Sequence, residues 1–162
     1  MHPLFRLMTI RQQKRIRRKF GRHVSFGDLW TNRWQTAKNL NFGEGTSCYD
    51  NVLVLGSVKV GKNCWIGPNV VLDGSGGLTI GDNVSVSAGV QIYSHNSVMW
   101  SQSGGAADIE RKPTTIGSNV YIGPNSVIQM NVIIGNNVII GALSFVNKDI
   151  PTNSKYYGTK IV

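Results

Sequence analysis

Aliphatic residues recur every six positions over most of this chain. They run in steps of six from Phe42 to Leu72, from Ile80 to Ile92, and from Ile116 to Val146, with Cys48 as one member of the series. Together they define fifteen hexapeptides. In eight of these the next residue is glycine: Gly43, Gly61, Gly67, Gly81, Gly117, Gly123, Gly135 and Gly141. A small or β-branched residue often stands four positions after the aliphatic one, as in Val84, Val120 and Ser126.

A period of six fits neither the 3.6-residue turn of an α-helix nor the two-residue alternation of a long strand. It is typical of a chain that forms a short strand, turns and repeats. The aliphatic residue and the residue four positions later then point inward, and glycine accepts backbone geometry that a Cβ resists. One repeat cannot bury its apolar side alone, so neighbouring repeats must stack. The pattern therefore predicts an all-β fold, a parallel β-helix.

The motifs also resemble a known family, the left-handed β-helix hexapeptide-repeat acyltransferases. The resemblance covers residues 42–160 and is carried by IGPNVVL, IGDNVSV, IYSHNSVMW, IGSNVYIGPNSVI, IIGNNVIIGALSFVNKDIP and YYGTKI. It implies a left-handed helix with three hexapeptides in each triangular coil, and hence about five coils stacked roughly 4.8 Å apart. It further implies acetyl-CoA as co-substrate and a homotrimer with active sites between subunits.

The six-residue register breaks twice, each time after the third hexapeptide of a coil. Two extra residues enter between Leu72 and Ile80, and eighteen enter between Ile92 and Ile116. We therefore expect both insertions to emerge at one corner of the triangle on adjacent coils. Stacked insertions on a rigid scaffold are typical of a binding or catalytic site.

His95 lies at the start of the long insertion and is the only histidine in the repeat region. The resemblance implies that it is the general base, since acetyl-CoA is already activated and the acceptor needs only to lose a proton. Many relatives place a histidine two positions further on, where this chain has Ser97, so the assignment rests on His95. The alternative is a solvated loop histidine. Asp73, in the small insertion, is expected to orient His95 or bind an acceptor hydroxyl, or else to form an Asp-Gly turn.

Three further residues are candidates for acceptor binding: Asn69, Asn96 and Trp100. The inserted loop, residues 96–115, contains Gly104 and Gly105 and so is expected to be flexible. The resemblance implies that such a loop leans over the cleft between two subunits. Trp100 then either covers the acceptor or packs on the wall of the prism.

The C-terminal coils resemble the coenzyme A edge of the family, where small residues lie against the pantetheine arm and basic residues meet the phosphates. The matching positions are Gly123, Gly141, Ala142, Asn147, Lys148 and Lys160. The family's usual ending, Gly-Xaa-Pro-Ala followed by a basic residue, is shortened here to Gly158-Thr159-Lys160. This departure weakens the assignment of Lys160.

Charge is concentrated at the N-terminus. The chain has 17 basic and 8 acidic residues, a net charge of +9, and residues 1–22 contain eight basic residues and no acid. Residues 4–20 suit a basic, partly amphipathic helix that either rests on an anionic membrane or caps the open end of the β-helix, with nucleic acid a weaker alternative. Residues 23–41, with Trp30 and Trp34, are expected to complete the cap.

We therefore divide the chain into an arm and cap (1–41), the β-helix (42–151) and a tail (152–162). No apolar window is long enough to span a membrane, and no secretory signal is evident. Cys48 and Cys64 fall at inward positions and cannot form a disulfide framework. These features favour the cytoplasm, with the inner face of the membrane as a further option through the arm.

The resemblance favours an acetyl-CoA-dependent transferase that acetylates a sugar hydroxyl, free or lipid-linked, in cell-surface polysaccharide synthesis. N-acetylation of an amino sugar or an antibiotic is the enzymatic alternative, and a structural or scaffold β-helix is the non-enzymatic one. The γ-class carbonic anhydrases share the fold but bind zinc through three histidines, which one repeat-region histidine cannot supply, so no metal site is expected.

Overall fold

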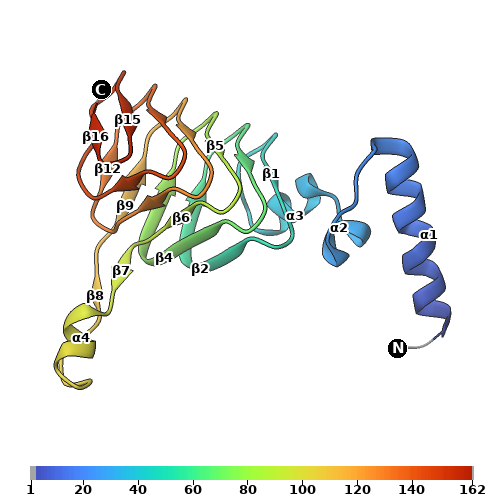
Figure 1. The fold of residues 1–162 in the computed structure, drawn as a ribbon, viewed down its shortest axis with the longest axis horizontal. Coiled ribbons are helices and arrows are strands. Elements are labelled where there is room, and N and C mark those ends of the chain that lie inside the picture. Colours follow the sequence, from blue (N-terminus) through green and yellow to red (C-terminus); the bar gives the residue numbers. More distant parts are fainter. Residues whose placement is uncertain (1–2, 162) are drawn as a thin grey trace.

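A computed structural model describes residues 3–161 and contains a parallel β-helix with three faces (Figure 1). The first face holds β1 (Ser47–Cys48), β3 (Trp65–Ile66), β5 (Ser85–Val86), β10 (Tyr121–Ile122), β13 (Ile139–Ile140) and β15 (Lys155–Tyr157). The second holds the first halves of β2 (Leu53–Val60) and β4 (Val71–Ile80), then β6 (Gln91–Ile92), β11 (Val127–Ile128) and β14 (Phe145–Val146). The third holds the second halves of β2 and β4, then β9 (Thr114–Ile116) and β12 (Ile133–Ile134).

The predicted all-β helix is confirmed, and it continues beyond residue 151. Strand β15 pairs in parallel with β13, and Tyr156 fills the inward position of this added rung, where it is fully buried. Its hydroxyl donates a hydrogen bond to the carbonyl oxygen of Phe145 at 2.9 Å. The chain then turns back into β16 (Lys160–Ile161), which pairs antiparallel with β15. Residues 155–157 therefore begin a sixth turn, so the β-helix extends into the segment expected to be a tail.

The core consists of the repeating residues identified in the sequence. The aliphatic positions stack in register from coil to coil, for example Ile66, Val86, Ile122 and Ile140 on the first face. Each of these side chains is at most 1% exposed. The residues four positions later, such as Val84 and Val120, are buried beside them. Full burial of one such side chain contributes about 1.5–3 kcal/mol, so the stacked column is the main source of stability.

Asparagine shapes the corners of the coils. Nine asparagines and Leu143 adopt a left-handed backbone with φ between 54° and 62°, which asparagine tolerates better than most residues. On the corner between the third and first faces, a ladder of hydrogen bonds joins the side-chain amides of Asn83, Asn119, Asn137 and Asn153. Each Nδ2 donates to the Oδ1 of the next asparagine at 3.0–3.2 Å. These side chains therefore bond each coil to the next.

The repeated glycines permit close stacking of the coils. A Cβ added to Gly123 would lie 2.4 Å from the amide nitrogen of Ala142 and 2.6 Å from the carbonyl carbon of Gly141. Both atoms belong to the backbone, which cannot move without separating two coils.

We expect Gly123→Ala to lower the free energy of unfolding by about 2 kcal/mol, because the added methyl overpacks the space between two coils. Urea unfolding measures this. Gly104→Ala is the matched control, since nothing lies within 4 Å of its added Cβ and only its positive φ of 66° opposes the change. A Gly123→Ala protein as stable as the wild type would contradict this role.

The N-terminal end of the β-helix is covered by two short helices, α2 (Phe26–Trp30) and α3 (Arg33–Asn39). Contact with the core is made by Ala37 of α3 and by Phe42, which are 1% and 8% exposed. The expectation that Trp30 and Trp34 form this packing surface is wrong, because both indoles are more than a third exposed. A small residue is needed where the helix approaches the first coil.

Helix α1 (Pro3–Phe20) does not cap the β-helix. It has no buried residue and lies beyond α2 and α3 at the end of the molecule (Figure 1). Its contacts are with the cap: the Phe5 ring lies 5.9 Å from Trp30 and 5.7 Å from Phe26, and Gln13 donates a hydrogen bond to the carbonyl oxygen of Val24. No helix in the described part of the chain is both long and apolar enough to cross a bilayer.

The two cysteines are buried in the core as expected. Burial raises the pKa of the Cys48 thiol to about 12, with a further contribution from the negative charges of Asp28 and Asp50. Burial also raises the pKa of Cys64. Because the thiolate is the reactive form, both side chains act as small core residues.

Candidate active site

The two insertions meet at the corner between the second and third faces, which we call the site corner. The small insertion lies within β4, opposite a register shift in its pairing with β2. The long insertion leaves as β7 (His95–Asn96), forms helix α4 (Val98–Gln102) and returns as β8 (Glu110–Arg111). Backbone contacts join the two, since the amide of Gly76 donates to the hydroxyl of Ser94 at 2.8 Å. The predicted stacking of the insertions is therefore confirmed.

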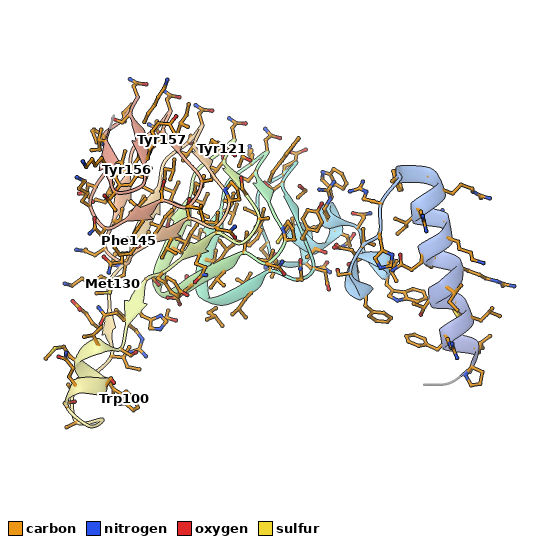
Figure 2. All side chains as sticks on the ribbon, viewed as in Figure 1. Trp100, Tyr121, Met130, Phe145, Tyr156 and Tyr157 are labelled. Carbon is orange, nitrogen blue, oxygen red and sulfur yellow. The ribbon has the colours of Figure 1, made fainter. Side chains whose placement is uncertain are left out.

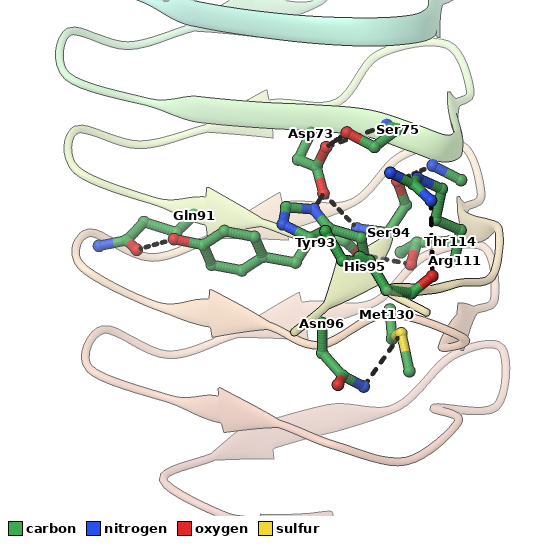
Figure 3. A network of polar contacts seen from close by, with 12 residues as sticks. Asp73, Ser75, Gln91, Tyr93, Ser94, His95, Asn96, Arg111, Thr114 and Met130 are labelled. Atoms are coloured by element: carbon green, nitrogen blue, oxygen red, sulfur yellow. Dashed lines mark hydrogen bonds and ion pairs between the residues drawn. The ribbon is translucent and has the colours of Figure 1, made fainter. Parts of the chain in front are cut away.

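Asp73 and His95 form a hydrogen-bonded pair at this corner (Figure 3). The distance from His95 Nδ1 to Asp73 Oδ2 is 2.5 Å, and Oδ2 also accepts from the amide of Ser94 at 2.9 Å. The other oxygen, Oδ1, accepts from the amide and the hydroxyl of Ser75 at 2.9 and 2.5 Å. The carboxylate is fully buried, whereas the His95 side chain is 31% exposed.

These contacts fix the charge on Asp73. Burial alone raises the pKa of this carboxyl, but the Ser75 hydroxyl, the amides of Ser94 and Ser75, and the His95 ring outweigh it. The pKa is lowered from 3.8 to about 2. Asp73 is therefore a carboxylate at neutral pH and accepts hydrogen bonds only.

The carboxylate in turn fixes the tautomer of His95. A neutral imidazole that donates from Nδ1 carries its lone pair on Nε2. The Tyr93 ring packs against the imidazole at 6.2 Å in an edge-on arrangement, and the Tyr93 hydroxyl donates to Gln91 at 2.6 Å. His95 is thus held as a base with a free Nε2, a geometry suited to accepting a proton from a bound hydroxyl or amine.

The lowered pKa of Asp73 predicts a loss of stability in acid. A group whose pKa is lower in the folded state stabilises the fold above its unfolded pKa, and that stabilisation disappears as the pH falls through the folded value. A shift from 3.8 to about 2 corresponds to about 2 kcal/mol. We expect the wild-type melting temperature to fall between pH 4 and pH 2 by several degrees more than that of Asp73→Asn. Parallel curves for the two proteins would contradict the shift.

His95 opens onto a groove of about 510 Å³ that follows the second face toward the C-terminal coils. Its wall combines the aliphatic and aromatic side chains of Val127, Met130 and Phe145 with the amides of Gln129 and Asn131. The ammonium of Lys112 borders it and is paired with Glu110 at 2.7 Å. The groove therefore offers an apolar floor with polar groups beside the histidine.

The acceptor candidates fall in three different places. Asn96 lines the groove, and its amide donates to Glu110 at 3.0 Å. Trp100 lies on α4, which projects away from the β-helix (Figure 2), and it is 48% exposed. Within this chain Trp100 neither borders the groove nor packs on the prism wall. Packing on the wall is therefore wrong, whereas contact with an acceptor at the boundary between two subunits stays a prediction.

Asn69 does not belong to the site. It lies on the corner between the first and second faces, with φ of 57°, and accepts a hydrogen bond from Asn51 at 2.7 Å. The sequence placed it close to Asp73 along the chain, but one face of the triangle separates the two corners. Asn69 is a corner asparagine of the kind described above.

The six coenzyme A candidates lie outside the groove lining. Asn147 and Lys148 are exposed on the site corner, two coils beyond His95. Gly123, Gly141 and Ala142 lie on the opposite edge of the second face, and Lys160 is exposed in β16. A Cβ on Gly141 would lie 2.3 Å from the Tyr157 ring. Coil packing thus accounts for both glycines, and contact of any of the six with coenzyme A stays a prediction.

Several residues of the site were not predicted from the sequence. Ser75 and Ser94 bind the carboxylate, Tyr93 packs against the imidazole and donates to Gln91, and Lys112 borders the groove. One signal was present in the sequence. In eight hexapeptides the residue after the aliphatic one is glycine, whereas Asp73 and Tyr93 occupy this position in theirs.

Comparisons with known proteins agree with the repeat and the fold. Residues 113–148 match the bacterial transferase hexapeptide (six repeats), and residues 57–94 match the hexapeptide repeat of succinyl-transferase. A comparison with curated protein sequences finds no significant match.

Solved structures with this fold include a hexapeptide-repeat-containing acetyltransferase from Vibrio cholerae complexed with acetyl coenzyme A. It is 23% identical with a TM-score of 0.72, covering 99% of this chain and 87% of that one. Another is a variant of AntD, an N-acyltransferase from Bacillus cereus, in complex with dTDP and coenzyme A. It is 23% identical with a TM-score of 0.67, covering 75% of this chain and 69% of that one.

The chain is thus a hexapeptide-repeat protein of the left-handed β-helix type. The family resemblance drawn from its motifs, that of the hexapeptide-repeat acyltransferases, is confirmed.

Proposed function

We propose that the protein is an acetyl-CoA-dependent acetyltransferase that acetylates a hydroxyl group of a sugar. The observation that carries this proposal is the His95–Asp73 pair at the mouth of the groove. The repeat family and the acetyl coenzyme A complex of the Vibrio cholerae structure support it. A solvated loop histidine would have no need of a fully buried carboxylate with three further hydrogen-bond donors.

The reaction requires the proton of the acceptor hydroxyl to be transferred to Nε2 of His95. Nε2 of His95 accepts the proton of the acceptor hydroxyl as its oxygen attacks, and Asp73 holds the ring and stabilises the imidazolium that results. Acetyl-CoA supplies an acetyl group already activated as a thioester. The same proton leaves with the coenzyme A thiol, so the products are an acetyl ester and the free thiol, and His95 is restored.

The groove fits the chemistry of the pantetheine arm. Val127, Met130 and Phe145 provide apolar surface for its methyl and methylene groups, and the side-chain amides of Gln129 and Asn131 match its two amides. Lys148 lies on the same corner as His95, two coils or about 10 Å further on, where we propose that it meets a phosphate. A neighbouring subunit in a homotrimer would close the open side of the groove, and Trp100 would then contact that neighbour.

Transfer to an amine is the second candidate. One AntD structure, 18% identical with a TM-score of 0.66, contains dTDP-4-amino-4,6-dideoxyglucose together with coenzyme A. An amine on a nucleotide-linked sugar is therefore the alternative acceptor for this chain, and Nε2 of His95 would take the amine proton in the same way.

The experiment is release of the coenzyme A thiol by the purified protein, with matched panels of neutral sugars and amino sugars, free and nucleotide-linked. The purified product is then treated with alkaline hydroxylamine, which cleaves oxygen esters and leaves amides intact. We expect turnover with a neutral sugar and a cleavable product. An uncleaved product would establish N-acetylation instead, and no release with any acceptor would remove both proposals.

We propose a role in cell-surface polysaccharide synthesis in the cytoplasm, on a sugar that is free or carried on a lipid.

A further inference from the structure

Apolar and basic residues of α1 are separated along the helix axis. Its first eight residues contain Leu4, Phe5, Leu7, Met8 and Ile10, whereas the remaining ten contain six basic residues. No Asp or Glu occurs before Asp28, so nothing acidic in this part of the chain offsets the charge. A helix arranged in this way has an apolar half and a cationic half.

The contacts of α1 show which side faces away from the protein. Thr9, Gln12, Gln13 and Ile16 are half-buried and lie on one side of the helix, toward the cap. The opposite side follows helical spacing and is exposed throughout; its members, which we call the outer stripe, are Leu4, Leu7, Met8, Arg11, Lys14, Arg15 and Arg18. Because α1 lies across the end of the molecule beyond the cap, the outer stripe faces away from the β-helix (Figure 1).

Large apolar side chains are exposed both on the helix and on the cap. Leu4, Leu7 and Met8 are 61%, 47% and 44% exposed. Phe26 and Trp30, which pack beside Phe5, are 54% and 39% exposed. Exposed apolar side chains in such number mark an interaction site, and tryptophan favours the boundary between lipid and water.

We infer that the outer stripe of α1 is a docking surface for a membrane that contains anionic lipid. Leu4, Leu7 and Met8 enter the boundary between headgroups and acyl chains, and the basic half of the stripe lies among the headgroup phosphates. Charge complementarity selects an anionic partner, and the apolar half selects a bilayer. A nucleic acid would bind the basic half but would leave Leu7 and Met8 in water. This inference does not rest on the proposed acetyl transfer.

The test is flotation of the full-length protein with vesicles of phosphatidylcholine alone and of phosphatidylcholine with 30% phosphatidylglycerol. We expect binding to the anionic vesicles at least tenfold stronger than to the neutral ones, and weaker binding at high salt. Lys14→Glu with Arg18→Glu should reduce binding at least tenfold. The control, Lys59→Glu with Lys62→Glu, changes the net charge equally at exposed positions on the β-helix and should retain most of the binding.

A second variant separates the possible partners. Leu7→Gln with Met8→Gln keeps every charge and uses a residue that favours helices. We expect it to bind anionic vesicles several-fold more weakly, with an unchanged circular dichroism spectrum. Undiminished binding by this variant, together with tight binding of duplex DNA, would overturn the inference in favour of a nucleic acid. The absence of binding to anionic vesicles by the wild type would overturn it outright.

Discussion

Replacement of His95 by alanine is expected to lower the turnover number for acetyl transfer by a hundredfold or more. General base catalysis contributes roughly 10²–10⁴-fold, and no other side chain lining the groove has a free imidazole nitrogen or an unpaired carboxylate. Glu110, the nearest acid along the inserted loop, is occupied by Lys112 and Asn96. Steady-state kinetics with the best acceptor measure the effect.

His23→Ala is the matched control for this change. His23 lies in the segment between α1 and α2, at the far end of the molecule from the groove, and its Nε2 is 3.5 Å from the side-chain amide of Gln13. It should retain turnover within about twofold. A His95→Ala protein with full activity would show that the base lies elsewhere. A loss confined to KM would show that His95 only binds substrate.

Asp73→Asn is expected to have the second large effect and to lower the turnover number about fiftyfold or more. Both oxygens of Asp73 accept two hydrogen bonds each, whereas an asparagine has one oxygen and one NH₂ group. If the NH₂ group faces His95, the imidazole must accept at Nδ1 and carry its proton on Nε2, where it no longer acts as a base. If the NH₂ group faces Ser75 instead, it lies opposite the amide N–H of Ser75, so that two hydrogen-bond donors meet in a buried site.

Asp82→Asn is the control for this variant. Asp82 accepts a hydrogen bond from the amide of Lys62 at 2.6 Å, but it lies at the corner between the third and first faces and does not border the groove. Its replacement should leave turnover nearly unchanged. Equal activities for Asp73→Asn and the wild type would show that the carboxylate has no part in positioning His95. Because Asp73→Asn also loses stability, both activities are compared well below its melting temperature.

The fold was predictable because each hexapeptide contains the inward-pointing residue whose stacking forms the core. Ile122 and Ile140 stand eighteen residues apart and are stacked neighbours, so the sequence period is also the structural period. The breaks in the six-residue register also predict the site corner and the nearness of Asp73 to His95. The register does not reveal what a non-repeating segment does, which is why Ser75, Ser94 and Lys112 were missed.

The wrong expectations have a common physical origin. Asn69 was associated with the site by its nearness to Asp73 along the chain, although a hexapeptide turns the chain onto another face. The two tryptophans of the cap were expected to pack on the β-helix, and Trp100 either to pack there or to cover the acceptor, because all three are large and apolar. Their place depends on the direction in which the loop and the short helices leave the body, and no repeat specifies that direction.

The most direct test of this account is a crystal structure of the protein with coenzyme A bound. We predict that the thiol lies in the groove beside the second face, with its sulfur within about 4 Å of Nε2 of His95. Such a structure would place the sulfur that carries the acetyl group beside the base that Asp73 orients. A thiol bound on another face, out of reach of His95, would contradict the assignment of this corner as the active site.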